Sequence, residues 1–153
     1  MSRAFVKEQD TAAEQLPDRP VSEHPNDVTP EGAAQIDAEL AAARAAYATA
    51  QQSEDRAALA LASRDVRYWS ARRATARIVA RSEDHDHVRF GSLVTIVRDD
   101  GREQSFRIVG EDEADPAGGS ISHVSPLAKA MFGKRVGDSV RAGAGEAEIR
   151  RIS

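Results

Sequence analysis

The sequence predicts an α+β protein in which an N-terminal antiparallel helical hairpin precedes a small domain of strands and one short helix. Between residues 29 and 80, apolar residues in an alanine-rich stretch recur every three or four positions, which is the helical period. After residue 88, apolar and polar residues alternate in short runs that glycine, proline and aspartate separate. The 153 residues are enough for one domain or two small ones.

Residues 1–28 form the first segment and contain three of the six prolines, Pro17, Pro20 and Pro25. The segment has no apolar periodicity. Proline restricts the backbone to extended conformations and disfavours a helix before it. We therefore predict that residues 1–28 form an extended or disordered arm.

The first helix is expected to begin at Thr29, which is a good N-cap, with Pro30 in the first helical position and Glu31 in the first turn. It continues to about Gln52. Its apolar positions are spaced by four, three and four residues, which predicts a narrow apolar seam of Ile36, Leu40, Ala43 and Tyr47.

Ser53 offers a second N-cap before Glu54 and Asp55, and a second helical pattern runs to about Val79. Its seam positions are Leu59, Ala62, Val66, Trp69 and Ala76, and Arg73 interrupts them. One long continuous helix is the rival interpretation. We favour the hairpin over residues 29–80, because a single helix would leave both seams uncovered.

A polar linker over residues 81–87 precedes the C-terminal domain of residues 88–153. Alternation predicts strands at 88–97 and 103–110 around an Asp-Gly turn, followed by an acidic loop at 111–119. The domain then continues with a strand at 120–124 and a helix that begins at Ser125-Pro126 and ends at Gly133. It ends with strands at 136–142 and 146–152.

Composition excludes several classes of function. The chain has no cysteine, so disulfides and thiolate sites are absent, and the His85-x-His87 pair lacks further ligands, so we predict no metal site. No apolar run approaches the ~20 residues that span a bilayer, and no secretory signal is visible. We therefore expect a cytoplasmic protein that does not bind membranes.

Charge argues against strong autonomous binding to nucleic acid. The net charge is −4, and only residues 29–80 are slightly basic, with seven basic and six acidic side chains. A protein that grips phosphates would carry a larger basic excess. A protein partner is the better expectation.

Four motifs in the C-terminal part carry a resemblance. They are Arg107-Ile108-Val109-Gly110, the acidic run Asp112–Asp115, Ser125-Pro126-Leu127-Ala128, and Gly133-Lys134 followed by Gly137-Asp138. In this order and spacing they resemble the C-terminal domain of the Gre family of bacterial transcription elongation factors. The resemblance extends over residues 28–153.

The resemblance implies an FKBP-like C-terminal domain that binds RNA polymerase through its β′ subunit at the rim of the secondary channel. The helical hairpin would project into that channel as a coiled coil, and any contact with DNA would be indirect. In GreA and GreB an acidic tip helps hold a magnesium ion that hydrolyses backtracked RNA. Carboxylates suit Mg²⁺, and a metal-bound water is a good nucleophile.

The tip motif of the cleavage-active relatives is absent here. Residues 65–72 could match that tip, or residues 67–79 could match the far end of the return helix. We prefer the second register, because its spacing to the C-terminal domain fits. The hairpin is then shorter by ~15 Å at 1.5 Å per residue, and Glu54 and Asp55 form its tip. Their plainer interpretation is favourable charge at a helix N-terminus.

The resemblance also suggests polymerase-binding residues. Val124, Ser125 and Pro126 match the segment that grips the polymerase, although relatives carry Asp or Asn where this chain has Val124. Asp112 lies in the acidic loop and is a second candidate contact. The rival interpretations are a simple helix start for Ser125-Pro126 and a solvated loop for Asp112.

Three functional hypotheses follow. The first is a monomeric regulator of elongation that is not itself an enzyme, has no cofactor and lacks efficient stimulation of transcript cleavage. The second is a full cleavage factor that delivers Glu54 and Asp55 to a magnesium ion shared with the polymerase. The third is a peptidyl-prolyl isomerase, an activity that relies on a pocket lined by aromatic residues. It is the least favoured, because the C-terminal half has only Phe90, Phe106 and Phe132 and no Tyr or Trp.

Overall fold

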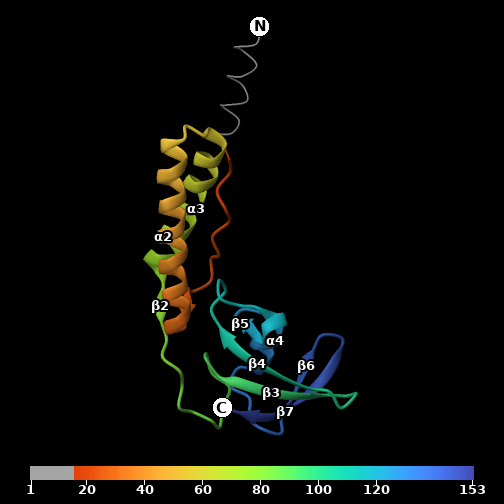
Figure 1. The fold of residues 1–153 in the computed structure, drawn as a ribbon. Coiled ribbons are helices and arrows are strands. Elements are labelled where there is room, and N and C mark those ends of the chain that lie inside the picture. Colours follow the sequence, from red (N-terminus) through yellow and green to blue (C-terminus); the bar gives the residue numbers. More distant parts are fainter. Residues whose placement is uncertain (1–15) are drawn as a thin grey trace. The chain divides into compact units, whose positions relative to one another are not determined.

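The fold was analysed in a computed structural model that describes residues 16–153 (Figure 1). The first fifteen residues of the predicted arm lie outside the described residues. The described chain divides into two compact units, one of residues 16–23 with 34–75 and one of residues 24–33 with 76–153. None of the helices in residues 16–153 is long and apolar enough to cross a membrane.

The helical unit is the predicted hairpin. Helix α2 spans Pro30–Gln52 and α3 spans Arg56–Thr75, and they lie side by side with a turn between them (Figure 1). On α2, Ile36, Leu40 and Ala43 are buried, and Ala50 continues the row one step further. The first three are predicted seam positions, but the fourth predicted position, Tyr47, is only half-buried. The rival of one continuous helix is wrong, because α2 and α3 are separate helices.

On α3 the seam agrees with the prediction only in part, because Leu59 and Val66 are half-buried and Ala76 lies beyond the end of the helix at Thr75. Ala62 and Trp69 are buried as expected, but the next buried residue is Arg72, at 1% exposure. Arg73 is exposed, and its Nε lies 2.8 Å from Asp37 Oδ1. The prediction that Arg73 interrupts the seam is wrong, because the buried row advances by three residues where a strict heptad needs four.

The end of the arm contacts α3 within the same unit. Arg67 Nε lies 2.7 Å from Asp18 Oδ1, and Arg19 Nη1 lies 3.1 Å from Asp65 Oδ1. The guanidinium of Arg19 also stacks 3.9 Å from the ring centroid of Tyr68. An arginine over an aromatic face is attracted by the ring quadrupole. This part of the extended arm is therefore fastened to the hairpin, which the sequence did not indicate.

Two short strands open the second unit. Strand β1 (Asp27–Val28) pairs in parallel with β2 (Arg77–Ile78). Arg77 Nε also donates to Asp27 Oδ1 at 2.7 Å. Helix α3 therefore ends at Thr75, about four residues before the predicted end, because the following backbone joins β1 instead of continuing the helix.

The remaining elements form an α+β domain. Its strands are β3 (Leu93–Arg98), β4 (Glu103–Val109), β5 (Ser120–Ser122), β6 (Ser139–Ala142) and β7 (Gly145–Ile152). They lie in the order β5-β4-β3-β7-β6, with β4 and β5 parallel and the other pairs antiparallel. The turn η1 (Pro116–Gly118) precedes β5, and helix α4 (Pro126–Met131) follows it (Figure 1).

The core of this domain is packed by the inward faces of the sheet and α4. Val94, Ile96, Ile108, Met131 and Ile149 are all fully buried. Alternating residues of one strand face the same side, so the period-two pattern in the sequence correctly placed this core. The predicted α+β class with an N-terminal helical hairpin is confirmed.

Several strands are shorter than predicted. Val88 is buried but belongs to no strand, because its N–H donates to Lys134 O and its carbonyl accepts from Gly133 N. Strand β3 therefore begins at Leu93. The 136–142 strand shrinks to β6, since Gly137 takes a positive φ of 93° in the turn before it.

Candidate functional site

The turn between α2 and α3 holds the predicted tip residues. The N–H of Asp55 donates to Ala50 O at 3.2 Å, and the N–H of Glu54 donates to Gln51 O at 3.4 Å. This pair of bonds is the Schellman motif that closes a helix C-terminus. It requires a left-handed residue after the helix, and Glu54 takes that conformation with φ of 54°.

Asp55 performs the capping role that the sequence assigned to Ser53. Asp55 Oδ1 accepts from Ala58 N at 3.1 Å, which makes Asp55 the N-cap of α3. Ser53 Oγ instead donates back to Thr49 O at 3.0 Å. The N-cap prediction for Ser53 is wrong, because that residue still belongs to the end of α2.

Both tip carboxylates lie on exposed residues. The helices that carry them are short, with 23 residues in α2 and 20 in α3. At a rise of 1.5 Å per residue these helices are roughly 35 and 30 Å long. The tip can present two carboxylates to a partner, but one oxygen of Asp55 already accepts a backbone hydrogen bond.

The other predicted contact residues lie in the second unit. Ser125 is the N-cap of α4, where its Oγ accepts from Ala128 N at 3.3 Å. Pro126 occupies the first helical position and is exposed, whereas Val124 is half-buried. Asp112 is half-buried and makes a contact of its own in the loop after β4. Ser125 therefore has a local structural task, whereas Pro126 is exposed.

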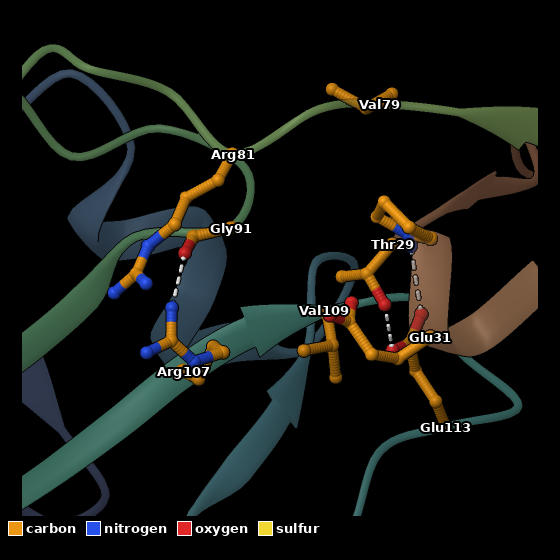
Figure 2. Close-up of a pocket in the computed structure, with 9 residues that line it drawn as sticks. Thr29, Glu31, Val79, Arg81, Gly91, Arg107, Val109 and Glu113 are labelled. Carbon is orange, nitrogen blue, oxygen red and sulfur yellow. Dashed lines mark hydrogen bonds between the residues drawn. The ribbon is translucent and has the colours of Figure 1, made fainter.

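Glu113 has a role that the sequence did not reveal. Its carboxylate accepts hydrogen bonds from Thr29 N at 3.0 Å and a short one from the Thr29 hydroxyl (Figure 2). It also accepts one from Gly110 N at 3.2 Å. Thr29 Oγ1 in turn accepts from Gly32 N at 2.9 Å, so the predicted N-cap is confirmed. An acidic residue 84 positions after the cap gives no local signal in the sequence.

A cavity of about 420 Å³ lies in the second unit beside this cap (Figure 2). Its walls include the charged side chains Glu31, Arg81 and Arg107. Arg107 Nη1 donates to Gly91 O at 2.9 Å. Burial lowers the pKa of Arg107, the neighbouring charge of Arg81 lowers it further, and Glu31 opposes the shift.

The described residues contain no cluster of three or more His, Asp or Glu that could hold a metal ion. Of the histidine pair in the linker, His87 takes part in a hydrogen-bond chain. His87 Nδ1 lies 3.1 Å from Asp84 Oδ2, and Arg135 Nε donates to His87 Nε2 at 3.0 Å. This arrangement engages both ring nitrogens of His87.

Comparison with known families gives one match. Residues 83–151 match the family described as "Transcription elongation factor, GreA/GreB, C-term". The matched range contains β3 to β7, helix α4 and the predicted contact residues Asp112, Val124, Ser125 and Pro126.

Individual proteins show the same similarity. The chain is 44% identical over 79 residues to transcription elongation factor GreB of Neisseria meningitidis serogroup B, covering 50% of this chain and 48% of that protein. It is 50% identical over 56 residues to GreA of Rhodospirillum rubrum, covering 36% of each. The chain thus spans about half the length, or less, of these relatives.

Solved structures of related factors are also similar to this chain. GreA factor homolog 1 (Gfh1) of Thermus thermophilus is 23% identical with a TM-score of 0.39, over 85% of this chain and 99% of that one. A GreA/GreB factor from Nitrosomonas europaea is 19% identical with a TM-score of 0.41, over 86% of this chain and 99% of that one.

Proposed function

From the premise that this chain belongs, through its C-terminal domain, to the GreA/GreB family of transcription elongation factors, we propose that it binds bacterial RNA polymerase and regulates elongation. It acts through the polymerase, in the cytoplasm and as a monomer, and is not itself an enzyme. The observation that carries this proposal is the family match over residues 83–151. Its binding surface is the C-terminal domain, which docks on the β′ subunit at the rim of the secondary channel.

Pro126 is the centre of the proposed docking surface. It is exposed at the start of α4, and the Ser125 cap fixes the backbone beside it. Val124 next to it is half-buried, so this contact is more apolar than in relatives with Asp or Asn at that position. Asp112 adds a carboxylate from the loop after β4. The surface suits a partner that presents an apolar patch with a polar rim.

The hairpin occupies the entrance of the channel without stimulating transcript cleavage efficiently. This part of the proposal is supported by helices of 23 and 20 residues, because the preferred register of the resemblance implies longer arms in the cleavage-active relatives. Metal coordination tolerates errors of tenths of an ångström, whereas the expected shortfall is ~15 Å. The protein therefore needs no cofactor of its own.

One observation favours the alternative, a full cleavage factor. Glu54 holds a left-handed conformation that glycine would adopt with less strain, and strained positions concentrate at functional sites. In that case Glu54 and the free oxygen of Asp55 would contribute to a magnesium ion shared with the polymerase. The two carboxylates are too few for a complete magnesium site in this chain alone.

Docking is tested by co-purification of the full chain with core RNA polymerase. Pro126→Asn is expected to lower retention of the chain on the polymerase. Pro116→Asn is the matched control, because Pro116 is also exposed and opens the short helix η1. Removal of residues 34–75 is expected to leave binding largely intact. Full retention of Pro126→Asn would contradict the assigned surface.

Cleavage is tested on a stalled, backtracked polymerase complex with labelled RNA. We expect the wild-type chain to add no shortened RNA above the intrinsic background. Shortening that disappears in Glu54→Gln/Asp55→Asn would establish the alternative in place of our proposal. Glu39→Gln is the control, since Glu39 is an exposed carboxylate of α2 away from the tip.

A further inference from the structure

We propose that the cavity of the second unit binds a small phosphorylated ligand, with its phosphate between the guanidinium groups of Arg81 and Arg107. All the residues that line the cavity belong to that one unit. None of them is among the polymerase contacts proposed above, so the proposal does not depend on them. A volume of about 420 Å³ is in the range of small-molecule sites.

The two arginines lie on the same side of the cavity. Arg107 comes from β4 and Arg81 from the segment after β2, and Figure 2 shows their guanidinium groups close to each other beside Gly91. The bond from Arg107 Nη1 to Gly91 O fixes one guanidinium in place. Arginine has five N–H donors, so most of those on Arg107 remain available for an anion.

The positive charge of this pair is not neutralised. No carboxylate among residues 16–153 lies within ion-pair distance of Arg81 or Arg107. The two guanidinium groups repel each other: burial lowers the pKa of Arg107 most, and the charge of Arg81 lowers it further. A bound anion would convert this repulsion into attraction, and two guanidinium forks match the oxygens of a phosphate dianion.

The two acidic residues of the cavity, Glu31 and Glu113, do not neutralise the arginine pair. The carboxylate of Glu113 is engaged by Thr29 and Gly110. Glu31 is exposed in the first turn of α2 and makes no ion pair with either arginine in the part of the chain that the structure describes. The negative charge of Glu31 instead disfavours a second anionic group on the ligand. Its carboxylate oxygens can accept hydrogen bonds from hydroxyl or amino groups.

The uncharged walls indicate the rest of the ligand. Pro30, Val79 and Val109 give the cavity apolar surface that suits a carbon skeleton. A phosphate at the arginines, a small skeleton along these walls and a donor group toward Glu31 describe one chemical class. That class is the small phosphomonoesters that carry hydroxyl or amino groups, such as sugar phosphates.

The proposal is tested by calorimetric titration of the full chain with ribose 5-phosphate, inorganic phosphate, acetate and ribose at constant ionic strength. We expect ribose 5-phosphate to bind more tightly than inorganic phosphate, and acetate and ribose to give no saturable heat. Arg81→Gln and Arg107→Gln should each lower the affinity for ribose 5-phosphate about tenfold or more, since each removes charge-assisted hydrogen bonds.

Two further variants sharpen the test. Arg102→Gln is the control, because Arg102 is exposed and pairs with Asp100 outside the cavity. The affinity of this variant for ribose 5-phosphate should equal that of the wild type. Glu31→Gln should raise the affinity for inorganic phosphate several-fold, because it removes a negative charge that repels the anion. Arg81 is exposed, so Arg81→Gln remains decisive even if the loss of the Arg107 bond to Gly91 impairs folding.

Several results would overturn the proposal. These are no saturable heat with either phosphate compound, equal affinity for acetate or ribose, or unchanged affinity in the folded Arg81→Gln variant. Thermal unfolding of each variant, followed by circular dichroism, establishes that the protein titrated is folded.

Discussion

Glu113 and Gly32 constrain each other at the scale of single residues. A Cβ atom placed on Gly32 would overlap the Glu113 carboxylate, which is held by Thr29 and Gly110. In an ordinary helix, replacing glycine by alanine raises stability by about 1 kcal/mol. Here the clash reverses that sign, so the glycine at this helix start is explained by a carboxylate from a distant loop.

We predict that Gly32→Ala lowers the free energy of unfolding by about 2 kcal/mol in the wild type, the usual cost of overpacking. Glu113→Ala alone should cost about 2 kcal/mol through its lost hydrogen bonds. In that background Gly32→Ala should instead stabilise by about 1 kcal/mol. Urea unfolding of the four proteins measures this, with Ala34→Gly as a control. Equal effects of Gly32→Ala in both backgrounds would refute the coupling.

The carboxyl group of Asp84 leads to a second prediction at the scale of single residues, because its pKa is lowered in the folded chain. Partial burial raises the pKa of its carboxyl, but N–H groups of Asp86 and His87 and the side chains of His87 and Arg89 lower it more, to about 2. The pKa is lower in the folded than in the unfolded chain, where it is near 3.9. The stability that ionised Asp84 contributes is therefore present above about pH 4 and is lost as the pH falls through 2.

The measurement is the urea midpoint of the wild type and of Asp84→Asn between pH 6 and pH 2.5. The wild type should be more stable above pH 4, and the difference should shrink as the solution is acidified. Asp100→Asn serves as a comparison, because hydrogen bonds from Arg102 also lower the pKa of Asp100. A difference between wild type and Asp84→Asn that is constant over this range would show that the pKa of Asp84 is not lowered.

At the scale of elements, the turn between α2 and α3 combines the backbone bonds of the Schellman motif with the side-chain cap of Asp55. The Schellman motif needs a left-handed residue, and Glu54 supplies one at a conformational cost of about 1 kcal/mol. We predict that Glu54→Gly raises the free energy of unfolding by about that amount. Glu39→Gly, inside the exposed face of α2, should lower it by about 1 kcal/mol. Thermal unfolding distinguishes the two signs, and destabilisation by Glu54→Gly would mean that the turn is misassigned.

The elements that could be predicted are those with many repeats of one period. The helical spacing of Ile36, Leu40 and Ala43 on α2, and the alternation of Ala147 and Ile149 on β7, identify the element and its buried face. Strands β1 and β2 could not be predicted, because two residues contain no period and their partners lie 50 positions apart. The Ser53 cap was misplaced by two residues for a related reason, as several polar residues in that turn are good caps.

The candidate sites divide in the same way. Ser125 and Pro126 could be placed at a helix start, since Ser-Pro carries a local signal for one. The contacts of Glu113 with Thr29, and the approach of Arg81 to Arg107, join residues that are far apart in sequence. Only the tertiary structure brings such residues together, so one sequence alone gives no sign of them.

At the scale of the whole molecule, we assign docking to the C-terminal domain and the acidic tip to the helical hairpin. The C-terminal domain carries the family similarity and therefore the proposed binding to polymerase. The helical hairpin lies outside the matched residues 83–151, and its helices of 23 and 20 residues are joined by a tight turn with two exposed acidic residues. We propose that a factor built this way competes with cleavage factors for one docking place without replacing their activity.

The most direct test is GreA-stimulated cleavage of a backtracked polymerase complex in the presence of increasing amounts of this protein. We predict progressive inhibition of RNA shortening that a higher concentration of GreA relieves, while Pro126→Asn inhibits less than the wild type. Unchanged cleavage at saturating protein, or added cleavage that depends on Glu54 and Asp55, would contradict the account.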